Sequence, residues 1–154
     1  MRTLTYDLHF YFDPVCPFAW LTSKWVRQVA RQRDYRVDWR FISLRILNAH
    51  IDYAAHFPEH YEEGHTAGLR LLRVAARTRA RHGRDAVGAL YEAIGTRIFD
   101  TPRDEDPLSA SDQGARHVLE PLLRQAGCRT TSPTLSTTPP WMRRSAPRPR
   151  RRWR

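Results

Sequence analysis

The first 44 residues constrain the fold most strongly, because two strand-like segments flank one helix-like segment. Residues 4–12 (LTYDLHFYF) alternate loosely and are rich in Tyr, Phe and Leu, which predicts a strand. Residues 18–34 contain neither Pro nor Gly and predict a helix that ends at about Arg33. Residues 35–44 (YRVDWRFISL) predict a second strand, because apolar side chains recur with period two at Tyr35, Val37, Trp39 and Phe41. Strands joined by such a crossover are parallel, so the sequence predicts an α/β protein built on a βαβ unit.

Three helices are predicted after this unit. Residues 59–82 form the first, which ends before Gly83 and carries an apolar face made of Leu69, Leu72, Ala76 and Ala80. The second covers residues 85–99, and the third covers residues 109–125 with Ser109 or Ser111 as its cap. The prediction is therefore a helical insertion from about residue 59 to 127, within a domain that spans residues 1–127.

Basic charge is concentrated at the end of the chain. The 154 residues carry a net charge of +10, but all 16 acidic residues lie within 1–120, and residues 121–154 hold nine Arg and no acid. Residues 128–154 are rich in Arg, Pro, Ser and Thr and lack apolar periodicity, so they cannot bury enough surface to offset their chain entropy. We expect one domain followed by a disordered Arg/Pro-rich tail.

Composition also bears on location and partners. No apolar run approaches the roughly 18 residues that a membrane span needs, and the N-terminus has no signal-peptide pattern. Two cysteines, Cys16 and Cys128, are too few for a secreted disulfide framework. We therefore expect a cytoplasmic protein with no membrane partner. The domain itself is nearly neutral, so nucleic acid is not its expected partner.

Cys16 lies in the predicted turn between the first strand and the first helix. Pro17 follows at the first helical position, where a missing N–H costs nothing. The sulfur is thereby placed at the positive end of the helix dipole, which stabilises a thiolate by about 1 kcal/mol. Thiolate is the nucleophilic form of cysteine. Position alone fits a small buried hydrophobic cysteine equally well.

The surrounding sequence favours the reactive interpretation. FYFDPVCPFAWLTSKWV resembles the active-site segment of DsbA-type thioredoxin-like proteins, in which a strand precedes Cys-Pro-x-Cys and a helix. RFISLRILN, HFPEHYEEG and LYEAIGTRIFD are similar to parts of the mycothiol-dependent nitroreductase family within that group. The resemblance implies a cytoplasmic oxidoreductase with Cys16 as the attacking thiolate in a motif completed by Pro17, Phe18 and Ala19. It also implies a pocket formed by Trp20, Asn48 and Tyr61.

One motif position departs from this family. Its second Cys is replaced by Ala19, so the helix cannot close an intramolecular disulfide. Cys16 can still attack a disulfide or another electrophile, but an external thiol must resolve the adduct. The sequence therefore predicts monothiol chemistry, and the resemblance implies mycothiol as the small-thiol cofactor.

Two other functions remain open. FYFDPVCPFAWL is also similar to kappa-class glutathione transferases and hydroxychromene-carboxylate isomerases, in which a Ser at the position of Cys16 stabilises bound glutathione thiolate. A non-enzymatic alternative is nucleic-acid binding by the basic tail, where Trp141 and Trp153 would stack on bases.

The resemblance implies a C-terminal ββα half that residues 128–154 cannot supply, because their five prolines interrupt any strand ladder. We therefore hypothesise that this half is absent from the chain, which leaves a two-stranded sheet, and an inactive truncated product is a further alternative to the functions above. A one-base loss near codon 127 of a GC-rich gene would produce such an ending, and the nucleotide sequence tests this. In that case Cys128 is a chance tail cysteine.

Histidines give no metal site by pattern. His56 and His60 have an HxxxH spacing, which binds metal when both lie on one helix, and His65 follows. Pro58 separates the first pair, so we expect them to straddle a helix start. No metal is predicted.

Overall fold

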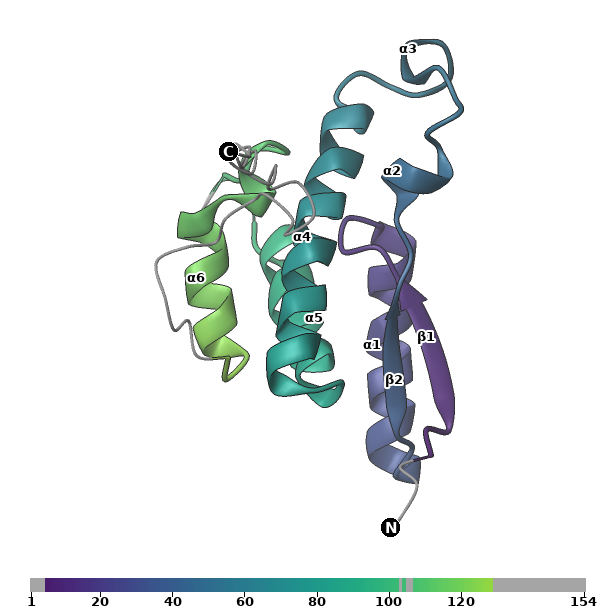
Figure 1. Ribbon diagram of the computed structural model, residues 1–154, viewed down its shortest axis with the longest axis vertical. Coiled ribbons are helices and arrows are strands. Elements are labelled where there is room, and N and C mark those ends of the chain that lie inside the picture. The colour runs from purple at the N-terminus through teal and green to yellow at the C-terminus, as the bar shows by residue number, and fades with distance from the viewer. Residues whose placement is uncertain (1–4, 103, 105–106, 129–154) are drawn as a thin grey trace, which may run out of the picture.

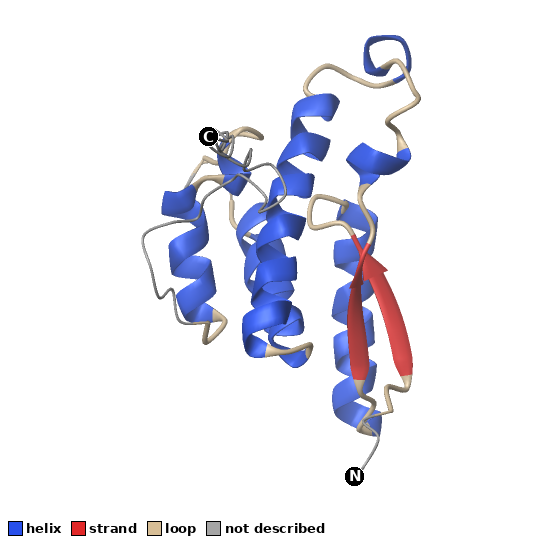
Figure 2. Cartoon of the chain, in the orientation of Figure 1, coloured by secondary structure: helices blue, strands red, loops and turns tan. Residues whose placement is uncertain are grey.

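A computed structural model describes residues 5–102, 104 and 107–128 (Figure 1). Strands β1 (Leu8–Phe12) and β2 (Val37–Phe41) pair in parallel and are joined by helix α1 (Pro17–Arg33). The register places Leu8 opposite Val37 and Phe12 opposite Phe41. Figure 2 shows the two strands as a narrow sheet lying against α1. The predicted βαβ unit is confirmed, as is the end of its helix at Arg33.

The rest of the described chain is helical. Figure 1 shows α4 and α5 side by side in the middle of the molecule, between the βαβ unit and α6, with α2 and α3 near the start of α4. These elements, in chain order, are α2 (Leu44–Leu47), α3 (Tyr53–His56), α4 (Tyr61–His82), α5 (Asp85–Gly95), the π-helical turn η1 (Thr96–Asp100), the 3₁₀ turn η2 (Asp112–Gly114) and α6 (Arg116–Gln125).

The single helix predicted for residues 109–125 is wrong, because the chain breaks after η2. Ser109 Oγ accepts a hydrogen bond from the Asp112 N–H at 3.2 Å, which closes a turn. Ala115 is then extended, with φ −75° and ψ 150°, and it precedes α6 in place of a serine cap. A serine that bonds its own local backbone competes with helix formation, which explains the break.

The apolar face predicted for α4 is also wrong in part. Leu72 is buried and Leu69 is half-buried, but Ala76 and Ala80 are exposed. Several buried residues of this helix are small or polar. The buried set is His65, Ala67, Gly68, Leu71, Leu72, Ala75 and Thr78. Since α4 contacts α2 on one side and α5 on another, its buried surface follows those neighbours rather than the hydropathy of the sequence.

An aromatic cluster joins the sheet to α1 and α5. The rings of Phe12 and Tyr91 stack with centroids 3.9 Å apart, and Trp39 meets the Tyr91 ring edge-on at 5.7 Å. Gly88 allows this approach, because a Cβ there would lie 2.6 Å from Trp39 Nε1. The second part of the core lies between α4, α5 and α6 and consists mainly of leucine and alanine side chains, with Ile94.

The alternation predicted for the second strand fails at two residues. Tyr35 precedes β2 and is exposed, whereas Asp38 is fully buried. Arg40 Nε and Arg84 Nη1 donate hydrogen bonds to Asp38 Oδ2 at 2.8 and 2.7 Å. Burial raises the pKa of Asp38, but these hydrogen bonds outweigh that effect and leave the pKa below its usual value. Paired guanidinium groups thus make a buried carboxylate tolerable.

The predicted tail begins one residue too early. Cys128 is buried against the leucines of α6, and its N–H donates to the Leu123 carbonyl at 2.8 Å. Cys128 is therefore packed with the domain, and its chance origin stays a prediction. The remainder of the predicted tail, residues 129–154, lies outside the described residues. Among the helices of the described part, none is long and apolar enough to span a membrane.

Candidate functional site

Asp13 organises the turn that follows β1. Its Oδ1 accepts the Val15 N–H at 3.1 Å, and its Oδ2 accepts the Leu44 N–H at 2.8 Å. The carboxyl therefore ties the β1–α1 turn to the start of α2. Burial raises the pKa of Asp13, while the two backbone N–H donors act in the opposite direction.

Cys16 occupies the N-cap position of α1. Its N–H donates to the Asp13 carbonyl at 3.0 Å, and its own carbonyl accepts the Trp20 N–H at 3.0 Å. The backbone is extended at φ −84° and ψ 111°, Pro17 begins the helix, and no side-chain capping bond is formed. The half-buried thiol, which forms no disulfide, therefore lies at the amino end of a 17-residue helix. A helix dipole favours negative charge at this end.

Cys16 opens onto a cavity of about 570 Å³, a size that suits a small-molecule ligand. It is lined by Val15, Cys16, Pro17, Phe18, Leu44, Asn48, Phe57, His60, Tyr61, Gly64, His65, Arg97, Ile98, Phe99, Thr101, Leu108 and Gln113. The structure thus brings Cys16 together with four of the residues singled out from the sequence: Pro17, Phe18, Asn48 and Tyr61.

Trp20 and Ala19 are placed elsewhere. Trp20 is buried in the aromatic cluster, where its ring meets Tyr91 edge-on and its Nε1–H donates to Asp100 Oδ1 at 3.1 Å. It is absent from the cavity wall, because its position on α1 turns it toward α5. Ala19 is half-buried beside the same core and offers no reactive atom.

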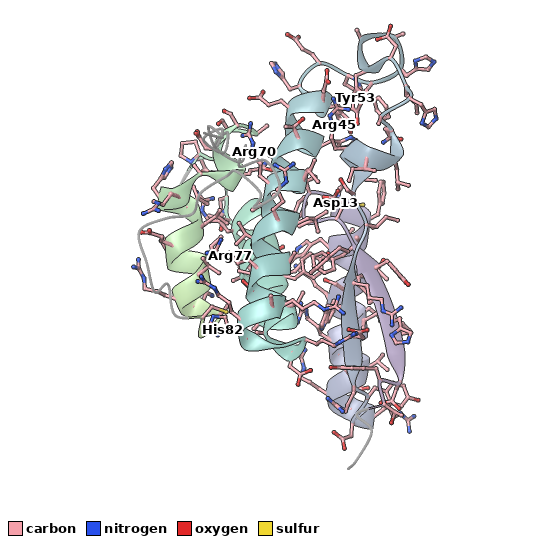
Figure 3. All side chains as sticks on the ribbon, viewed as in Figure 1. Asp13, Arg45, Tyr53, Arg70, Arg77 and His82 are labelled. Atoms are coloured by element: carbon pink, nitrogen blue, oxygen red, sulfur yellow. The ribbon has the colours of Figure 1, made fainter. Side chains whose placement is uncertain are left out.

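His65 is a site residue that sequence reasoning placed only in a metal motif. It is buried in the cavity wall on α4, with Nδ1 3.0 Å from the Tyr53 hydroxyl. Figure 3 labels Tyr53 and Arg45 beside the upper part of α4, with Asp13 below them at the end of β1. Burial lowers the pKa of His65, the Asp13 charge acts in the opposite direction, and Arg45 adds to the lowering. The balance favours the neutral imidazole.

Sequence reasoning also missed Asp13, Tyr53 and Gln113. Asp13 was available as a signal, since an acid between an apolar strand and a Pro is a common turn residue. Gln113 lines the cavity with a buried Oε1 that has no hydrogen-bond partner in the described structure. No local pattern marks Gln113 or Tyr53. Gln113 comes to the cavity, and Tyr53 comes to His65, through folding of separate segments of the chain.

Comparison with known proteins matches the sequence of this region to one family. The family model for the Rv2466c-like proteins, described as mycothiol-dependent nitroreductase Rv2466c, matches residues 15–132. The chain belongs to the Rv2466c-like family. This match begins at the Cys16 turn and includes every residue of the cavity wall.

A curated protein is similar to part of the chain. The uncharacterized protein Rv2286c of Mycobacterium tuberculosis is 37% identical over 86 residues. That alignment covers 56% of this chain but only 35% of the relative. The chain thus spans about a third of the length of the curated relative that it matches.

The three histidines considered for metal binding separate in the structure. His56 lies in α3 with Nδ1 3.0 Å from the Asp52 carbonyl oxygen, His60 precedes α4, and His65 contacts Tyr53. Within the described residues, no group of three or more His, Cys, Asp or Glu side chains is arranged to hold a metal ion.

Proposed function

We propose that this member of the Rv2466c-like family is a monothiol, low-molecular-weight-thiol-dependent reductase. Its nucleophile is Cys16, and mycothiol, which the family name specifies, is its cofactor. The observation that carries the proposal is the half-buried Cys16 thiol at the start of α1, opening onto a ligand-sized cavity. The described residues correspond to the βαβ half and helical insertion of a thioredoxin-like fold.

The reaction at a disulfide substrate is a two-step exchange. The Cys16 thiolate attacks one sulfur of the substrate, the substrate S–S bond breaks, and one thiolate leaves. A small thiol then attacks the outer sulfur of the resulting mixed disulfide and releases Cys16. Each step forms one S–S bond and breaks another, so the electrons balance.

A nitro compound is the second substrate class that the family name suggests. Cys16 and one small thiol together supply two electrons and two protons. They become a mixed disulfide, while the nitro group becomes a nitroso group with loss of one water. A second small thiol resolves the mixed disulfide as before.

The cavity wall suits a polar thiol cofactor. Asn48 and Tyr61 line the cavity and offer hydrogen-bonding groups. Mycothiol is a hydroxyl-rich thiol, so its hydroxyl groups can serve as donors to these residues. The thiol supplies the reducing electrons, and the residues of the wall orient it toward Cys16.

The replacement of the second motif cysteine gives a direct test. We treat the Ala19→Cys variant and the wild type with dithiobis(nitrobenzoate), which releases one coloured thiolate when Cys16 attacks it. The wild type should hold its adduct until a small thiol is added, whereas the thiol introduced by Ala19→Cys should displace the second coloured thiolate unaided. The release of coloured thiolate by the wild type should disappear in Cys16→Ala. If Cys16→Ala releases as much thiolate as the wild type, or if the wild type releases none, Cys16 is not the nucleophile.

Cys16→Ser separates this function from glutathione-transferase or isomerase activity. A hydroxyl can support a bound thiolate but cannot form a mixed disulfide. Loss of activity in Cys16→Ser is the expected result, and full retention would favour the alternative.

A further inference from the structure

His65 is held in the cavity wall by contacts from three aromatic residues. Its Nδ1 lies 3.0 Å from the Tyr53 hydroxyl. The rings of Tyr53, Phe57 and Tyr61 meet the imidazole at steep angles, with centroids 5.6 to 5.8 Å away. A buried, oriented imidazole in the same cavity as a reactive thiol is suited to proton transfer.

We propose that His65 is the general base that accepts the proton of the small thiol resolving the Cys16 mixed disulfide. The inference rests on the function proposed above, since it requires a Cys16 adduct that an external thiol must attack. The need for a base follows from Ala19, because no internal thiolate is available. A free cysteine thiol has a pKa near 8.5, so only a small fraction of an incoming thiol is ionised at neutral pH.

The proposal takes the Nδ1–H tautomer of His65, in which Nδ1 is the donor in the contact with the Tyr53 hydroxyl. When Nδ1–H donates to the Tyr53 oxygen, Nε2 carries the free lone pair. Burial keeps the imidazole neutral and able to accept a proton, whereas the Asp13 carboxylate favours the imidazolium formed next. Charged or titratable groups surround the His65 imidazole on the elements and turns that form the cavity. They are Asp13, Cys16, Arg45, Tyr53, His60, Tyr61 and Arg97.

The proton and electrons balance within the exchange. Nε2 takes the S–H proton, and the incoming sulfur attacks the outer sulfur of the mixed disulfide. The new S–S bond forms as the bond to Cys16 Sγ breaks, and the electron pair leaves on Sγ. The imidazolium then returns its proton to the Cys16 thiolate, so no other oxidant or reductant is required.

The test separates adduct formation from adduct resolution. In the full chain carrying Cys128→Ala, Cys16 is first converted to its nitrothiobenzoate adduct, and release by N-acetylcysteine amide is then followed against pH. His65→Gln should slow release about 100-fold at neutral pH. This deficit should shrink toward unity above about pH 8.5, where the probe thiol ionises by itself. The matched control, His56→Gln, lies on α3 outside the cavity wall and should release at the wild-type rate.

The outcomes distinguish this inference from the proposed function. If the chain with native His65 forms no Cys16 adduct, the proposed function fails. If the adduct forms and His65→Gln releases it at the native rate, or with a deficit that does not change with pH, His65 is not the base. Should His65→Gln fail to fold, Tyr53→Phe, which retains the imidazole, should slow release about tenfold at neutral pH, and an unchanged rate would overturn the proposal.

Discussion

Gly68 lets α4 approach the turn that carries Cys16. A Cβ at this residue would lie 2.6 Å from Asp13 Oδ1 and 2.7 Å from Val15 Cγ2. Both atoms belong to a turn whose carboxyl is bonded to two backbone N–H groups, so neither can move freely. Gly64, four residues earlier on the same helix, would place its Cβ in open space. The two glycines therefore form a matched pair for substitution by alanine.

The two substitutions should change the free energy of unfolding by different amounts. Replacing Gly by Ala within a helix stabilises it by about 0.8–1 kcal/mol, which should apply to Gly64→Ala. Gly68→Ala gains the same helix term but adds overpacking, which costs about 1–3 kcal/mol. The free energy of unfolding should therefore be lower for Gly68→Ala than for Gly64→Ala by about 1–3 kcal/mol.

Urea unfolding, followed by circular dichroism, measures this difference. Because the overpacked turn positions the nucleophile, alkylation of Cys16 should also change in Gly68→Ala. Equal stabilisation by both substitutions would refute the proposed packing of α4 against the Asp13 turn.

Two further predictions concern the cysteines and the buried ion pair. At neutral pH, iodoacetamide should label Cys16 at least about tenfold faster than Cys128, because burial shields the Cys128 thiol and raises its pKa. Peptide mass spectrometry measures both labelling rates. Equal rates in the folded protein would contradict the structure. Asp38→Asn should lower the free energy of unfolding at neutral pH by about 2 kcal/mol, since Arg40 and Arg84 lose a charged acceptor. The folded-state pKa of Asp38 is lowered, so its stabilising contribution is present above the unfolded value of 3.8 and is lost as pH falls through the folded pKa. Urea midpoints of the two proteins should thus converge in acid, and a constant gap would exclude this origin.

Local pattern predicted the elements that depend on neighbouring residues. Period-two alternation located both strands, and the absence of Pro and Gly located α1 and its end at Arg33. Pro17 likewise marked the helix start that places Cys16 at an N-cap. The same method failed for residues 109–125, where the local bond between Ser109 and Asp112 competes with a helix.

The sequence by itself determined the βαβ unit, the place of Cys16 and the presence of Ala19 three residues after it, because each depends on backbone preferences or residue identity over a few positions. Only the tertiary structure decided what surrounds the thiol. His65 and Gln113 meet at one cavity, with Tyr53 bonded to His65, because α3, α4 and η2 fold near the amino end of α1. Trp20 lies in the aromatic core and not in the cavity wall, and Cys128 is buried against α6. These arrangements depend on packing between distant segments, which periodicity along the chain does not record.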